Sequence, residues 1–251
     1  MTTQAKLRAV RARIAAIEAG STPAHGVLPF GDNRIDAAFP GGGLPLGRWH
    51  EVVGQGLEIE TGAAAGAFVA SLAAPLAKRG AVVWVMRRDD LHAPGLEGLG
   101  FAAQSLIQVL VADEAQVFAA LEDALASAGV AVAIGEAGAV DLVAGRRLQL
   151  ACEKRGATGF VIRRRPFGGE AREAPGSAAA SRWSVASAPS DPGPGEPGLG
   201  PPRWRVALER CRGGRTGEWL MEKADGPHAL RVVAPLGDRQ LAPAEPFRLA
   251  G

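Results

Sequence analysis

The sequence predicts an α/β fold built on a mainly parallel sheet with helices on its faces. Five short apolar segments alternate with helical segments, and this alternation is typical of parallel strands joined by crossover helices. The expected strands are "RWHEVV" (48–53), "AVVWVM" (81–86), "LIQVLV" (106–111), "VAVAIGE" (130–136) and "GFVIRR" (159–164). With 251 residues and 47% hydrophobic content, the chain can bury one sizeable core and carry an appendage.

The clearest helix in the sequence is "DEAQVFAALEDALAS" (113–127). Asp113 can cap its amino end, and Gln116 completes a capping box. Gly129 can end it. The apolar residues expected to face the core are Val117, Phe118, Leu121 and Leu125.

Residues 1–27 are expected to form an amphipathic helix and a linker that precede the main domain. The helix carries an apolar stripe and ends at Gly20; the stripe consists of Leu7, Val10, Ile14 and Ile17. Because this stripe needs a surface to cover, we expect the helix to take part in self-association or in partner binding. Charges run through the whole segment, which is unlike a signal peptide or a membrane span.

The overall charge and the cysteines point to an ordinary cytoplasmic protein. A net charge of +2 and a pI near 8.8 create no strong global field, so any nucleic-acid surface must be local. Cys152 and Cys211 lie far apart in the sequence, and we expect each to be a buried thiol rather than half of a disulfide. The four histidines have no metal-binding or catalytic spacing, and no metal site is expected; they are His25, His50, His92 and His228.

The predicted main domain spans residues 28–168, and residues 169–251 form a C-terminal extension with a different composition. Its stretch "PSDPGPGEPGLGPP" (189–202) is too rich in proline and glycine for a regular element and is expected to be a disordered loop. Alternating segments on both sides predict a small antiparallel unit; they are 181–186, 202–211, 217–223 and 229–234.

The end of the first strand is laid out like a phosphate-binding P-loop, but key residues are replaced. Placing Gly54 at the first glycine of G-x-x-x-x-G-K-[ST] puts Ile59, Glu60 and Thr61 at the last three positions. A β-branched residue resists the conformations open to glycine, and a carboxylate replaces the lysine that neutralises phosphate. Taken alone, Gly54 is equally well explained as a turn that ends a strand.

The flanking sequence resembles a known family. The stretch "FPGGGLPLGRWHEVVG" (39–54) resembles the opening of the RecA recombinase core, and the strand order and spacing over residues 28–165 are also RecA-like. Through "RWRVALERCRGGRTGEWL" (203–220) the chain is similar to ImuA, a RecA-like inducible-mutagenesis family without a functional P-loop. The resemblance favours a dismantled nucleotide site over a plain turn.

Other RecA positions are also altered. Where RecA carries the acidic residue that activates water, Arg87 and Arg88 precede Asp89 and Asp90. Glu136 is the nearest counterpart of the magnesium-organising aspartate, a vestigial position with no phosphate-bound metal to organise. We therefore expect no ATPase activity, no catalytic residue and no cofactor.

The resemblance implies a non-catalytic accessory factor of damage-induced (SOS) error-prone translesion DNA synthesis. By family analogy its partners are a Y-family-like adaptor polymerase homologue (ImuB-type) and an error-prone C-family polymerase. Two alternatives stay open. One is a cell-division inhibitor like SulA, and the other is a residual RecA-type NTPase in which Arg48, Arg87 or Arg88 replaces the missing lysine.

Arginines and tryptophans in the last third of the chain are the candidates for contact with a partner or DNA: Arg163, Arg164, Arg165, Trp183, Trp204 and Arg205. Guanidinium groups suit phosphates and acidic surfaces, and indoles can stack on bases. The alternatives are a strand end that places its charges in solvent and tryptophans that close a hydrophobic core. If the arginines are surface charges, alanine at residues 163–165 should leave the melting curve nearly unchanged.

Overall fold

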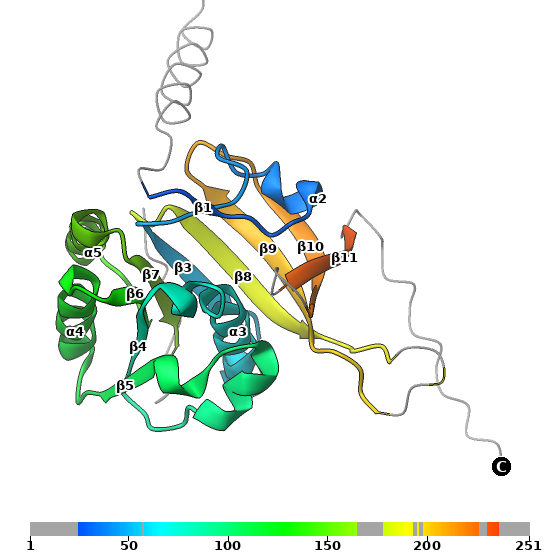
Figure 1. Cartoon of the computed structure of the whole chain (residues 1–251), viewed down its shortest axis with the longest axis horizontal. Helices are drawn as coiled ribbons and strands as arrows, with labels where there is room; N and C mark the ends of the chain where they lie inside the picture. The colour runs from blue at the N-terminus through cyan, green and yellow to red at the C-terminus, as the bar shows by residue number, and fades with distance from the viewer. Residues whose placement is uncertain are drawn as a thin grey trace, which may run out of the picture.

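The structure is a computed structural model that describes residues 25–56, 58–164, 178–192, 195, 198–225 and 230–235, with the backbone alone for residues 58–62, 103, 234 and 235. Its longer strands are β3 (Trp49–Gly54), β4 (Ala81–Met86), β5 (Leu106–Leu110), β6 (Val130–Ala137), β7 (Thr158–Arg163), β8 (Ser181–Ala188), β9 (Arg203–Cys211), β10 (Gly217–Lys223) and β11 (Leu230–Pro235). They form one sheet in the order β11-β10-β9-β8-β3-β7-β6-β4-β5 (Figure 1).

The half of the sheet from β5 to β8 is parallel throughout, as the alternation of segments predicts. All five strands expected in the core are confirmed to within two residues at their ends. Their side chains are buried on both faces along β4, β6 and β7, which explains why these segments read as nearly continuous apolar runs. The predicted fold class is therefore confirmed.

Helices cover both faces of this parallel half. On one face α3 (Glu58–Ala73) packs on β3 and β8, and on the other α4 (Glu114–Ala126) and α5 (Leu142–Arg155) pack on the central strands (Figure 1). Short 3₁₀ turns complete the connections: η1 (Leu76–Arg79), η2 (Ala93–Leu99) and η3 (Ala103–Ser105). The predicted cap of α4 is confirmed, because Asp113 Oδ1 accepts the Gln116 N–H at 2.9 Å.

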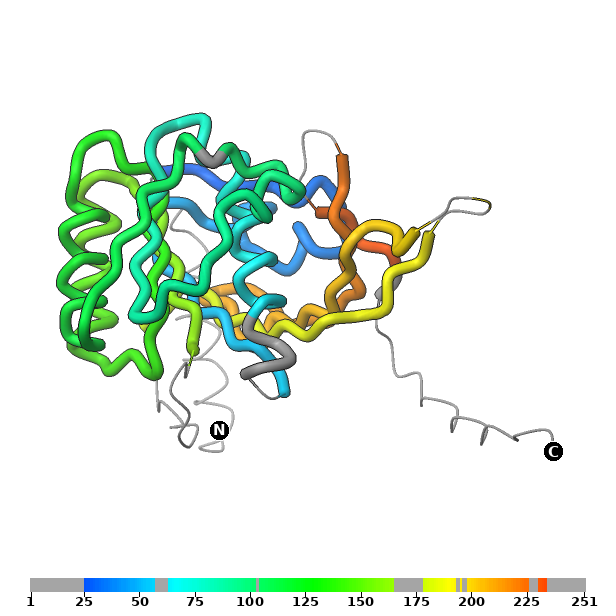
Figure 2. The backbone as a smooth tube through the Cα atoms, turned by 90° about the horizontal axis from the view of Figure 1, so that it is seen from below, coloured from blue at the N-terminus to red at the C-terminus, as the bar shows by residue number. Residues whose placement is uncertain are grey.

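The C-terminal strands continue the sheet of the core instead of forming a separate unit. β8 pairs in parallel with β3, and β9, β10 and β11 then add as antiparallel neighbours. In Figure 2 these strands, yellow to orange, extend away from the green helical layer of α4 and α5. An alternating pattern identifies a strand but does not say which sheet it joins, so the sequence could not settle this point.

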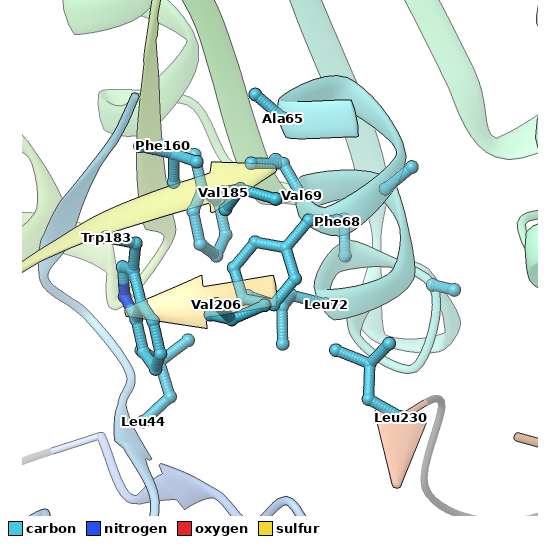
Figure 3. Close-up of a cluster of buried hydrophobic side chains, with 14 of the residues drawn as sticks. Leu44, Ala65, Phe68, Val69, Leu72, Phe160, Trp183, Val185, Val206 and Leu230 are labelled. Carbon is cyan, nitrogen blue, oxygen red and sulfur yellow. The ribbon is translucent and has the colours of Figure 1, made fainter. Parts of the chain in front are cut away.

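One large core unites the two halves on the α3 face of the sheet. Phe68 of α3 packs against Trp183 of β8 with ring centroids 5.5 Å apart (Figure 3). The segment before β3 adds Phe30 and Phe39 to the same tryptophan, at 5.9 and 5.8 Å. That segment holds β1 (Val27–Leu28), α2 (Asn33–Asp36) and β2 (Leu44–Pro45). The Trp219 indole N–H of β10 donates to the Arg34 carbonyl, which ties α2 to the C-terminal strands.

Several sequence expectations fall outside the described residues. The N-terminal amphipathic helix, Arg165 and the tail after residue 235 lie there entirely, and the loop 189–202 is described in part. Both cysteines are free thiols, as expected; Cys152 is buried as predicted, whereas Cys211 is only half-buried. Within the described part of the chain, no helix combines the length and the apolar character needed to cross a membrane.

Candidate functional site

The carboxyl ends of parallel strands are where an open α/β sheet normally binds its ligand, and the stretch predicted to be a degenerate P-loop lies there. β3 ends at Gly54 and α3 begins at Glu58, so only residues 55–57 connect them. The Gln55 N–H donates to the Val185 carbonyl of β8 at 2.8 Å. A P-loop turns such amides onto phosphate, whereas this one is bonded within the sheet. The side chains of Ile59, Glu60 and Thr61 lie outside the described part of the structure.

Glu136, the predicted counterpart of the magnesium-organising acid, is buried at the end of β6 with 4% of its surface exposed. Its Oε1 accepts the Trp84 indole N–H at 2.9 Å, and its Oε2 accepts Arg164 Nη1 at 2.7 Å. Burial raises the pKa of this carboxyl, while the charge of Arg164 and the indole hydrogen bond oppose the increase. Both carboxylate oxygens therefore have a partner inside the protein.

The same Arg164 guanidinium also binds Asp90, which follows β4. Arg164 Nη2 lies 2.9 Å from Asp90 Oδ2, and Nη1 lies 3.1 Å from Oδ1. The hydrogen bond from Arg164 lowers the pKa of the Asp90 carboxyl. One cation from the end of β7 thus binds two acids at the carboxyl ends of the strands, where a RecA-type site would hold a metal and a water.

The neighbouring Arg163 is engaged in the same way on the other face of the sheet. Its Nε donates to the Gly138 carbonyl at 3.1 Å, and its Nη1 lies 3.6 Å from Glu51 Oε1. Glu51 is fully buried on β3 and also accepts Arg182 Nε at 2.9 Å. The two arginines balance the charge of this buried carboxylate, and its Oε2 accepts the hydrogen bond.

These contacts correct the interpretation of the arginine cluster as a free binding surface. The side chains of Arg163 and Arg164 are only 14% and 16% exposed, so neither presents its charge fully to a ligand or simply to solvent. The partners of Arg164 lie 28 and 74 positions away in the sequence, so no local sequence pattern predicts these contacts. Arg165 lies outside the described residues.

The structure also corrects the suggestion that the paired tryptophans stack on bases. Trp183 is fully buried and Trp204 is 3% exposed, both in the core beneath α3. Neither indole has a free face for a base, and the alternative of core-closing tryptophans holds for both. Arg205, between Trp204 and Val206 on β9, points to the other face and is exposed. It stays a candidate for partner or DNA contact.

A buried chain of hydrogen-bonded polar groups lies at the start of β3, and no pattern in the sequence predicted it. His50 Nδ1 and Ser181 Oγ are 2.7 Å apart, Nε2 lies 3.0 Å from the Pro45 carbonyl, and the Trp183 indole N–H donates to Ser181 Oγ at 2.8 Å. Burial lowers the pKa of His50 to about 4, so the ring is neutral. Both His50 and Ser181 are fully buried, and we assign the group to the core.

Comparison with known proteins gives one strong relationship in sequence and a more distant one in structure. No family model matches the chain. The chain is 59% identical over 244 residues to Protein ImuA of Caulobacter vibrioides, in strains NA1000 / CB15N and ATCC 19089, and the match covers 94% of this chain and all of the relative. A solved structure of the RadB recombinase covers 82% of this chain and all of its own, with a TM-score of 0.54 and 15% identity. At that identity the structural match supports the RecA-like fold alone.

Proposed function

Because the chain belongs to the ImuA family, we propose that it is a non-catalytic, RecA-like accessory factor in inducible mutagenesis, acting in damage-induced (SOS) error-prone translesion DNA synthesis. In this role it binds a Y-family-like adaptor of the ImuB type and an error-prone C-family polymerase. The observation that carries the non-catalytic part is the Arg164 guanidinium, which binds both Glu136 and Asp90 from within the protein.

A metal-dependent hydrolase needs those carboxylates for a different purpose. To bind a cation there, the protein would first have to break two short charge-assisted contacts to Arg164, at 2.7 and 2.9 Å. Removing one partner of a buried ion pair costs about 3–5 kcal/mol. With Glu60 in place of the P-loop lysine, no phosphate-bound cation would offset that loss. These features support a scaffold that keeps the RecA-like fold without its chemistry.

The outer surface of α5 supports a role in protein binding. Val143 and Leu150 lie two turns apart on one face of the helix and are 70% and 50% exposed. Leu142 beside them is 61% exposed. Exposed apolar side chains gathered on one helix are typical of an interaction surface. We therefore take α5 as the surface to test for the adaptor.

The test is to purify the tagged full chain from cells after DNA damage and to identify the polymerase components that accompany it. The variant Val143→Lys with Leu150→Lys should lose the adaptor, because it places charge in an apolar contact. The matched control, Ile107→Lys with Leu110→Lys on β5, changes side chains that are also 50% and 60% exposed and should keep it. Recovery of neither polymerase component by the unaltered chain would refute the proposed partners.

A second variant separates this proposal from a residual NTPase. Glu136→Gln keeps the size of the side chain and one oxygen that can accept either the Trp84 or the Arg164 hydrogen bond, but it removes the carboxylate that a RecA-type site requires. An accessory factor should support damage-induced mutation normally with this change. Loss of mutagenesis in a folded Glu136→Gln protein, together with measurable ATP hydrolysis by the unaltered chain, would favour the enzyme. A SulA-like inhibitor would instead block cell division when overproduced and would capture no polymerase.

A further inference from the structure

A basic pocket lies at the amino ends of the parallel strands, whereas the predicted nucleotide site lies at their carboxyl ends. It is formed where β6 and β7 begin, whereas Glu136 and Arg164 lie where these strands end. The pocket has a volume of about 170 Å³. Its walls include the last residues of η1 and of α5, Arg79 and Arg155, together with His25 and the backbone around Gly156. None of the described residues that line it is acidic.

Arg79 and Arg155 are exposed, and within the described part of the chain no hydrogen bond or ion pair engages either guanidinium. Arginine in the last turn of a helix often serves only to offset the helix dipole. For α5 that need is already reduced, because the Gly156 N–H caps the Cys152 carbonyl at 2.8 Å. The nearby acid Glu153 is bound by Arg48 at 2.6 Å. Arg79 and Arg155 therefore retain their hydrogen-bonding capacity for a ligand.

The wall that His25 provides depends on two glycines with left-handed backbone. Gly47 and Gly156 have φ of +65° and +78°, and a Cβ atom added at Gly156 would lie 2.6 Å from His25 Nδ1. A Cβ at Gly47 would also collide with the imidazole ring. The ring thus packs directly on both glycine backbones, which places a third nitrogen-bearing side chain at the mouth of the pocket.

We propose that this pocket binds a phosphate group of a nucleic-acid strand. A guanidinium presents a planar fork of donors that matches the oxygens of a phosphate. A phosphate offers tetrahedral oxygens that can accept from two forks at once. Lys78 and Lys154 stand next to the two arginines in the chain and are also exposed, so the basic surface continues beyond one pocket. Such an extension suits a polymer with repeated phosphates better than an isolated ion.

This inference is independent of the role in mutagenesis, and its test uses the purified full chain. A fluorescent single-stranded oligonucleotide of about 20 nucleotides, longer than the usual site size, is titrated with protein while anisotropy is followed. Replacing Arg79 and Arg155 with alanine should weaken binding roughly tenfold or more, the effect of losing one or two charge-assisted hydrogen bonds. In a plot of the logarithm of the binding constant against the logarithm of the salt concentration, the negative slope should become shallower by about 1.4, because two phosphate contacts on a single strand are lost.

The matched control is Arg146→Ala with Arg212→Ala, which removes the same charge from exposed positions outside the pocket. It should bind nearly as the unaltered chain does. Equal weakening by both double variants would overturn the inference, because binding would then depend on net charge alone. The inference would also be overturned if the unaltered chain binds no oligonucleotide, or if the pocket variant binds as tightly as the unaltered chain.

Competition experiments identify the chemistry and the source of the ligand. Inorganic pyrophosphate should displace the oligonucleotide only weakly, because it offers no extended strand, whereas unlabelled oligonucleotide should displace it fully. Polyglutamate that competes as well as an oligonucleotide of equal charge would refute recognition of phosphate. Tight pyrophosphate binding without oligonucleotide binding would refute the strand as its source. If the alanine variant melts at a lower temperature than the unaltered chain, the variant Arg79→Lys with Arg155→Lys is titrated in its place. In the unaltered chain, the bound oligonucleotide must crosslink to residues 76–79 and 154–158.

Discussion

Replacing Arg164 with methionine should destabilise the protein by about 3–5 kcal/mol, the cost of leaving one charge of a buried pair without its partner. Methionine keeps the length and apolar character of the side chain but removes the guanidinium that lies 2.7 Å from Glu136 and 2.9 Å from Asp90. Glu136 is 4% exposed, so water cannot replace the lost cation. For a chain of this size the melting temperature should fall by roughly 6–20 °C. The structure thus reverses the expectation that alanine at residues 163–165 leaves the melting curve unchanged.

Urea unfolding followed by tryptophan fluorescence measures this cost. Adding Glu136→Gln to the Arg164→Met protein should recover part of the stability, because the second change removes the uncompensated buried charge, and the coupling between the two sites should be about 1–3 kcal/mol. Arg88→Met is the control, since Arg88 is 57% exposed and 3.9 Å from Asp90, and it should cost less than about 1 kcal/mol. The reasoning fails if Arg164→Met costs no more than this control and Glu136→Gln restores nothing.

Three further predictions follow from the core and from the degenerate P-loop. The pKa of His50 is about 4 in the folded protein against 6.5 for the free group; the unfolded chain therefore binds more protons between these values, and the stability present above pH 6.5 should fall by about 3 kcal/mol as the pH drops to 4. Urea unfolding at a series of pH values measures this, and His50→Asn should remove that part of the pH dependence. Phe68→Ala should cost about 3–5 kcal/mol in the same assay, because it empties a fully buried site against Trp183, and a cost under 1 kcal/mol would mean that the core refills. A fluorescent ATP analogue at micromolar concentration should show no saturable binding, since Ile59 and Glu60 replace the loop glycine and lysine; saturation would falsify the dismantled site.

The sequence by itself determined the elements of the fold, and it predicts that the nucleotide site is dismantled. The strands are apolar runs of the right length, and α4 has a helical stripe and a capping residue, so each can be recognised within a short window. The loss of the P-loop lysine is likewise a matter of one residue at one spacing. These properties depend on the chain's local preferences, and the structure confirms the elements that they predict.

Only the tertiary structure decided what the charged and aromatic side chains do. From the sequence, Arg164 was a candidate surface charge, but in the fold it binds Glu136 and Asp90. Trp183 was a candidate for stacking on bases, but α3 and the segment before β3 cover it. Ser181 contacts His50 from 131 positions away in the sequence, and Arg79 and Arg155 line the same pocket. Whether an arginine binds a ligand or a buried carboxylate depends on which residues stand beside it in space. The residues adjacent in the sequence do not determine these spatial neighbours, because crossover connections in a parallel sheet bring distant segments to the same ends of the strands.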